Sequence, residues 1–282
     1  QAASGNYTAV TATASLTVTA ATPSFSVSLS PTTIIYGASA PTISYTSTSS
    51  GTVTYTSSNT NVATINNSSG AISIVGIGSV TFTATQAASG NYASVSGTST
   101  LTVRAATPLL SVSLSASNAT FGTTAPTISY TSTSAGAVTY TSSDTNVATI
   151  NNSSGVITMV GAGSVTFTAT QAANGVYASV TGTTSLTILE ATPTLSVSLS
   201  SSSVYFGNAA PTISTSSTST GTISFSSSDT SVATINSSTG SITLIGIGTT
   251  TFTINQASTA NYKSTSTTTS LTINLGTPTL SG

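Results

Sequence analysis

Apolar and polar residues alternate along short stretches of this chain, the pattern of strands with one buried face. In the stretch 24–30, Phe25, Val27 and Leu29 alternate with serines. The same apolar face returns in two later stretches, at Leu110, Val112 and Leu114 and at Leu195, Val197 and Leu199. No segment shows the 3.6-residue periodicity of an amphipathic helix, so the pattern predicts an all-β protein.

The first complete unit is predicted to hold seven or eight short strands. They fall in the stretch 24–30, after Pro41 (Ile43 and Tyr45), at 51–58, 61–66, 72–74 and 80–84, and in a last strand that contains Leu101 and Val103. Turn residues separate these stretches roughly every eight to twelve residues, a spacing that favours a two-sheet antiparallel sandwich over a barrel or a parallel solenoid.

The whole pattern repeats with a period of 85 residues. Each period begins with a QA step, at Gln1, Gln86, Gln171 and Gln256, and each contains a Thr-Pro step, which ends at Pro23, Pro108, Pro193 and Pro278. A period of this length marks a unit that closes its own core. We therefore expect these parts: 1–19, the C-terminal strand region of a preceding repeat; the Ig-like repeats 20–104, 105–189 and 190–274; and 275–282, the start of a following repeat.

Nine residues are predicted to hold special structural positions. The prolines of the junctions fix their own backbone and restrict the preceding threonine, which gives a semi-rigid link between units and a rod-like array: Pro23, Pro108 and Pro193. Glycines that close a polar tetrapeptide predict hairpins: Gly70, Gly155 and Gly240. Tyrosines before the last strand predict a ring in the core with its hydroxyl bonded to backbone at a corner: Tyr92, Tyr177 and Tyr262.

Charged residues are very scarce, because two Lys and Arg and three Asp and Glu make up only 2% of the chain, against about 25% in typical domains. The surface must therefore consist of Ser, Thr, Asn and Gln. Sheet edges without charge favour side-by-side association, although hydroxyl groups also keep a surface hydrated. Weak long-range fields argue against nucleic acid or an anionic membrane as partner, and no apolar run is long enough to span a membrane.

The chemistry available to this chain is narrow. His and Cys are absent, which removes the commonest general base, the commonest metal ligand and the thiol nucleophile. Asp144 and Asp229 lie one period apart, in different units, and are interpreted as turn residues that bond local backbone. The sequence thus predicts no enzyme, no cofactor and no metal site; with a single Glu190 at the junctions, calcium-clamped linkers are not expected.

One run carries a family resemblance. VATIN-x-SSG-x-I-x-x-x-G-x-G-x-x-T-F-T-A-T-Q-A, followed by NY and a terminal LTV strand, resembles the bacterial Ig-like repeats of the group 2 type, which occur in tandem in large surface and adhesin-like proteins. The resemblance covers all three units, implies an Ig-like sandwich used as an extracellular spacer or adhesive module, and brings no catalytic residue. The near absence of Asp, Glu and Lys departs from common members of that family.

Together these features predict a structural protein at the cell surface or outside the cell. Its tandem modules would form a filament, a stalk or an adhesin shaft, with self-association as the expected partnership because each unit repeats the same uncharged faces. An alternative is a surface that binds a glycan or ice through ladders of Thr and Ser hydroxyls. A viral or phage fibre would use the same modules.

Overall fold

A computed structural model describes residues 1–276, so Pro278 and most of the expected 275–282 segment lie outside the described residues. The chain divides into two compact units, one formed by 1–108 with 173–179 and the other by 109–172 with 180 onward. The first unit contains one hydrophobic core and the second contains two. We call strands β1–β8, β9–β16 and β17–β24 the first, second and third repeat.

The three repeats have the same order of eight strands. In the first repeat these are β1 (Phe25–Ser30), β2 (Thr33–Ile35), β3 (Thr42–Ser47), β4 (Val53–Ser57), β5 (Ala63–Ile65), β6 (Ile72–Ile74), β7 (Gly78–Gln86) and β8 (Val95–Arg104). In the second they are β9 (Leu110–Leu114), β10 (Asn118–Thr120), β11 (Ile128–Ser132), β12 (Val138–Ser142), β13 (Ala148–Ile150), β14 (Ile157–Met159), β15 (Gly163–Gln171) and β16 (Val180–Leu189). In the third they are β17 (Leu195–Leu199), β18 (Ser203–Tyr205), β19 (Ile213–Ser217), β20 (Ile223–Ser227), β21 (Ala233–Ile235), β22 (Ile242–Leu244), β23 (Gly248–Gln256) and β24 (Thr265–Asn274).

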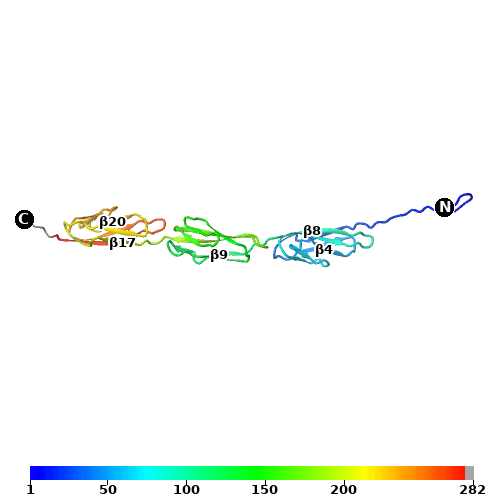
Figure 1. The fold of residues 1–282 in the computed structure, drawn as a ribbon, viewed down its shortest axis with the longest axis horizontal. Coiled ribbons are helices and arrows are strands. Elements are labelled where there is room, and N and C mark those ends of the chain that lie inside the picture. The colour runs from blue at the N-terminus through cyan, green and yellow to red at the C-terminus, as the bar shows by residue number, and fades with distance from the viewer. Residues whose placement is uncertain (277–282) are drawn as a thin grey trace, which may run out of the picture. The chain divides into compact units, whose positions relative to one another are not determined.

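Each repeat is a sandwich with a larger and a smaller sheet. In the first repeat β2, β8, β7 and β4 form a four-stranded sheet in that order, and β1 pairs with β3 in a two-stranded sheet. Figure 1 labels β4 and β8 of this larger sheet. The predicted hairpin is confirmed, because β5 and β6 pair antiparallel with Ile65 opposite Ile72. The all-β, Ig-like sandwich predicted from the sequence is therefore the observed fold class.

Each repeat also contains one parallel pair of strands that the sequence pattern did not predict. The short strand β2 runs parallel to β8, with Ile34 opposite Val103, and β10 and β18 repeat this pairing in the other repeats. The sequence pattern did not predict strand β2, because this strand is three residues long and only its middle residue, Ile34, is buried. Such a length is too short to show alternation.

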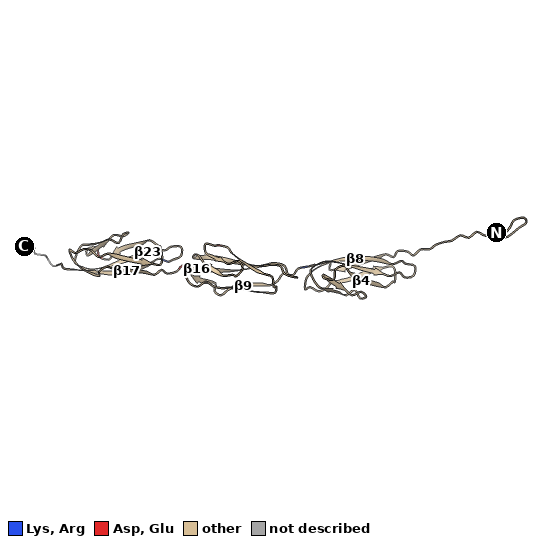
Figure 2. Cartoon of the chain, viewed as in Figure 1, with Lys and Arg blue, Asp and Glu red and all other residues tan. Residues whose placement is uncertain are grey.

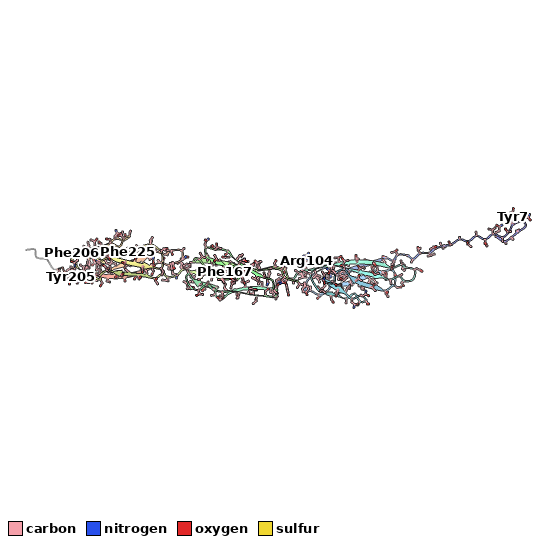
Figure 3. All side chains as sticks on the ribbon, in the orientation of Figure 1. Tyr7, Arg104, Phe167, Tyr205, Phe206 and Phe225 are labelled. Atoms are coloured by element: carbon pink, nitrogen blue, oxygen red, sulfur yellow. The ribbon has the colours of Figure 1, made fainter. Side chains whose placement is uncertain are left out.

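The core of each repeat lies between the two sheets. In the first repeat Phe82 on β7 and Leu101 on β8 are fully buried, and the equivalent pairs are Phe167 with Leu186 and Phe252 with Leu271. Phe167 lies inside the second repeat in Figure 3. Truncating such a buried ring to alanine costs about 3–5 kcal/mol. The cores are thus closed by strands of the same repeat, and the outward residues of those strands are left to face solvent.

Candidate functional site

On the outer face of the four-stranded sheet, nearly every side chain bears a hydroxyl group. In the first repeat Thr83 on β7 lies opposite Thr56 on β4 and opposite Thr98 on β8, so three threonines form a row across the sheet. A neighbouring row joins Thr54, Thr85 and Ser96. Because strands lie about 4.8 Å apart and alternate residues about 6.7 Å apart, the hydroxyls form a regular grid.

Hydrogen bonds between side chains link neighbouring members of a row across the strands. The hydroxyl groups of Thr81 and Thr100 lie 3.1 Å apart, and those of Thr85 and Ser96 lie 2.9 Å apart. The other repeats have equivalent pairs, Thr166 with Ser185 at 3.0 Å and Thr251 with Ser270 at 3.2 Å. Each bonded hydroxyl keeps further lone-pair capacity for water or a ligand.

The two-stranded sheet presents a second hydroxyl face. Ser28 on β1 and Ser44 on β3 are paired across the sheet with their hydroxyl oxygens 2.8 Å apart. In the second repeat the equivalent pair, Ser113 and Ser129, lies 3.0 Å apart. In the third repeat the neighbouring outward pair, Ser196 and Ser216, lies 2.7 Å apart. Apart from Arg104 at the end of β8, the strands of both faces carry no charged residue, and the cartoon in Figure 2 is accordingly tan over most of its sheets.

The side chains of Asp144 and Asp229 lie in turns and bond the local backbone. Asp144 accepts a hydrogen bond from the backbone N–H of Asn146 at 2.9 Å, and Asp229 accepts one from Ser231 at the same distance. The Ser231 hydroxyl also donates to Asp229 at 2.6 Å, and these bonds lower the pKa of that carboxyl group. The predicted role in local turns is confirmed. Residues 1–276 contain no group of three acidic, His or Cys side chains placed to hold a metal ion.

The predicted hairpin glycines occupy positions at which the backbone of any other residue would be strained. Gly70, Gly155 and Gly240 have φ values of 72°, 71° and 70°, in the left-handed region. A Cβ atom on Gly155 would lie 2.8 Å from Ile128 and 3.2 Å from the ring of Tyr140. The turn therefore packs its backbone directly against the core side chains.

The predicted junction prolines are all buried: Pro23, Pro108 and Pro193. Two residues before each proline, an alanine pairs in parallel with a tyrosine of the loop that follows the long strand β7, β15 or β23: Ala21 with Tyr92, Ala106 with Tyr177 and Ala191 with Tyr262. Ala191, for example, donates to the carbonyl of Asn261 and accepts from the N–H of Lys263, both at 2.9 Å. The junction is thus tied by backbone hydrogen bonds in addition to the restricted proline.

Contrary to the prediction from the sequence, the side chains of the three corner tyrosines lie neither in the core nor, in the described part of the chain, hydrogen-bonded to backbone. Tyr92, Tyr177 and Tyr262 are half-buried and belong to none of the core clusters. No hydrogen bond of their hydroxyl groups is found within residues 1–276. The reason is that the backbone of this loop, rather than the tyrosine hydroxyl, engages the neighbouring segment. The ring of Tyr262 instead packs edge-on against Phe121, with centroids 5.7 Å apart.

A buried glutamine is the structural residue that the sequence pattern did not reveal. Gln171 ends β15 and is 1% exposed. Its amide nitrogen donates to the carbonyls of Ser134 and Gly136, both at 3.0 Å, and its amide oxygen accepts from the Ser132 hydroxyl at 2.5 Å. Gln86 and Gln256 make the same three contacts in their repeats. The recurrence of QA at every period was the available signal, although a glutamine alone does not predict burial.

Burial also affects two tyrosines beneath the hairpins. Tyr55 and Tyr140 are buried, and burial raises the pKa of each phenol because the charged phenolate is disfavoured. The neighbouring Tyr45 and Tyr130 add a smaller upward contribution to the respective pKa values. The third repeat has Phe225 at this position.

No family model and no curated protein matches this chain. Among solved structures, the chain is similar to Drosophila N-cadherin EC1-4 (12% identity, 90% of this chain and 75% of that chain, TM-score 0.28). It is also similar to the surface layer protein SbsC, domains 1-6 (18%, 91% and 41%, TM-score 0.29), and to the Sidekick-1 immunoglobulin domains 1-5 (12%, 91% and 59%, TM-score 0.35).

The geometry of the strands defines the class of protein: the chain is an all-β protein built of tandem Ig-like sandwiches. In the described part of the chain, no helix is long and apolar enough to cross a membrane.

Proposed function

We propose that this chain is a structural protein outside the cell or on its surface, in which tandem Ig-like modules of the bacterial group 2 type form a filament, a stalk or an adhesin shaft. The observation that supports the proposal is the repetition itself. Each repeat builds the same closed core and the same two hydroxyl faces from its own strands. Repetition of this kind adds length and surface without adding new chemistry.

Self-association is part of the proposal. The formal net charge is −1, so copies repel one another very little. Because the hydroxyl faces recur in each repeat, a lateral contact that one repeat makes is open to the others as well. A periodic contact of this kind favours an ordered assembly over a single local contact.

Electron microscopy of native material tests this proposal. We expect regular filaments or thin beaded rods. Compact, separate particles at the same protein concentration would contradict the structural role.

A second candidate function is supported by the hydroxyl grid. A regular uncharged array of threonines suits a neutral polysaccharide or ice, since hydroxyl groups donate and accept hydrogen bonds without a charge to desolvate. The central row of the four-stranded face offers a direct test through Thr83→Lys, Thr168→Lys and Thr253→Lys made together. Ser44→Lys, Ser129→Lys and Ser214→Lys on the two-stranded face are the matched control.

If the larger face binds a neutral glycan, the first triple variant should lose binding on a glycan array and the control should keep it. The same pair of variants applies to ice, with growth of ice crystals as the readout. Equal behaviour of both variants and the unmodified chain would exclude the four-stranded face as a binding surface.

A further inference from the structure

The third repeat contacts the end of the second through two adjacent side chains of one loop. This loop, residues 257–264, follows β23 and is called here the third-repeat loop. Asn261 and Tyr262 both reach from it to the second repeat, and all residues concerned belong to the same compact unit.

The Asn261 contact is a hydrogen bond to backbone. Its side-chain oxygen accepts from the N–H of Ala162 at 2.8 Å, in the turn between Gly161 and Gly163 that leads into β15. Asn261 and Ala162 are both partly buried, so solvent competes less with this bond than with one on the open surface. Any residue without a side-chain acceptor would leave this N–H without that partner.

The Tyr262 contact is aromatic. Its ring meets Phe121 edge to face at 84°, with centroids 5.7 Å apart, a favourable arrangement for two rings. Phe121 is fixed in turn, since its N–H donates to the carbonyl of Leu189 at 2.8 Å, at the end of the last strand of the second repeat. The same loop also binds Ala191 of the connecting segment. Three separate contacts therefore converge on one loop.

The residues of the hydrogen bond differ between the repeats. The loop position of Asn261 is Val176 in the second repeat and Asn91 in the first, and the turn position of Ala162 is Ile77 in the first and Ile247 in the third. Asparagine thus faces a small alanine at the boundary of the second and third repeats. At the boundary of the first and second repeats, the equivalent positions hold Ile77 and Val176. Neither of these side chains can accept a hydrogen bond.

We propose that Asn261 and Ala162, with Tyr262 and Phe121, form a recognition contact that fixes the orientation of the third repeat on the second. The partner surface is a second module of the same chain, and its recognition depends on which residue stands at the loop and turn positions. Neighbouring modules are then not interchangeable, although their folds are the same. This inference is independent of an extracellular role and concerns contacts within one chain only.

Spin labels on the full chain provide the test. The sequence has no cysteine, so Thr139→Cys on β12 and Ser224→Cys on β20 create two unique, exposed labelling sites. The distance distribution between the labels should be narrow in the parent chain and broad in Asn261→Val. The matched control is Asn91→Val, the same substitution at the same loop position of the first repeat, which should leave the distribution unchanged.

Amide exchange gives an independent readout. In Asn261→Val the Ala162 amide should exchange roughly threefold to tenfold faster, the factor expected for a hydrogen bond of ordinary net strength. Ala162→Ile, which copies the bulk of Ile77, should also broaden the distance distribution because it obstructs the approach of Asn261. Circular dichroism of each variant establishes that the sandwiches stay folded.

One competing explanation is an ion pair. Glu190 and Lys263 line the crevice beside these contacts and carry opposite charges, but both are exposed. Salt would screen such a pair, whereas the proposed contacts are uncharged, so the parent distribution should stay narrow at high salt. A distribution that broadens with salt, or an Asn261→Val chain as narrow as the parent, would overturn the proposal.

Discussion

Each buried glutamine forms several hydrogen bonds to one loop of its own repeat. Gln171 satisfies two backbone carbonyls and one hydroxyl group that lie away from solvent. None of the buried side-chain polar atoms in the described residues lacks a partner. Removing the glutamine amide would therefore leave several groups unpaired at once, and unpaired buried groups cost more than a hydrogen bond contributes.

Gln171→Leu should destabilise the second repeat by about 2–4 kcal/mol, since buried carbonyls and a hydroxyl lose their partner. Hydrogen exchange followed by mass spectrometry on the full chain would report this loss in the second repeat alone. Thr170→Val, at the neighbouring outward and exposed position, is the control and should change stability by less than about 0.5 kcal/mol. Equal effects of the two substitutions would contradict the role assigned to Gln171.

Alkaline pH should reduce the stability of the first and second repeats more than that of the third. The pKa values of Tyr55 and Tyr140 are raised above the ordinary value of 10.0 by burial. The folded state therefore holds its phenol proton more tightly than the unfolded state. Stability is intact below the unfolded pKa of about 10 and is lost as pH rises from there through the folded value.

We expect the first and second repeats to lose hydrogen-exchange protection above pH ~10, while the third repeat, with Phe225 in this place, is affected less. Tyr140→Phe should make the second repeat behave like the third. If all repeats lost protection together in the parent chain and in this variant, the buried phenols would not be the cause.

At the scale of elements, the β5–β6 hairpin and its two counterparts depend on a close approach of backbone to core. Gly155 has a φ of 71°, and the space for its missing Cβ is taken by Ile128 and Tyr140. Backbone strain and overpacking therefore act at the same position. Gly175 also has a positive φ, 56°, but nothing lies within 4 Å of its missing Cβ.

Gly155→Ala should cost about 2–4 kcal/mol, because left-handed strain and overpacking add. Gly175→Ala should cost about 1 kcal/mol, from the backbone alone. Exchange protection of the β13–β14 hairpin distinguishes the two substitutions. If the Gly155→Ala chain were as stable as the Gly175→Ala chain, the core would have relaxed to admit the methyl group.

At the scale of the whole molecule, the low charge governs association. Replacing one outward threonine per repeat with glutamate, at Thr98, Thr183 and Thr268, takes the formal net charge from −1 to about −4, which should oppose self-association. Light scattering should show a smaller mean particle mass than for the parent chain at equal concentration. The matched Thr→Ser triple variant should associate like the parent, and an unchanged mass in the glutamate variant would show that these faces lie outside the contacts.

The alternation of residues alone determined the all-β class, the inward residues and the hairpin, because side-chain direction in a strand has a period of two. Phe82 and Leu101 could be assigned to the core from this pattern, and Asp144 could be assigned to a turn. These features are local, so neighbouring residues carry the information.

Tertiary structure alone decided the contacts between distant segments. The parallel pairing of β2 with β8, the burial of Gln171 and the role of Tyr262 depend on partners far away in the sequence. The Asn261 contact joins residues 99 positions apart. A repeating pattern cannot predict such a contact, because the pattern is the same in each repeat. Asn261 and Ala162 stand where other repeats have Val176 and Ile77, and only the tertiary structure shows that these two residues are in contact.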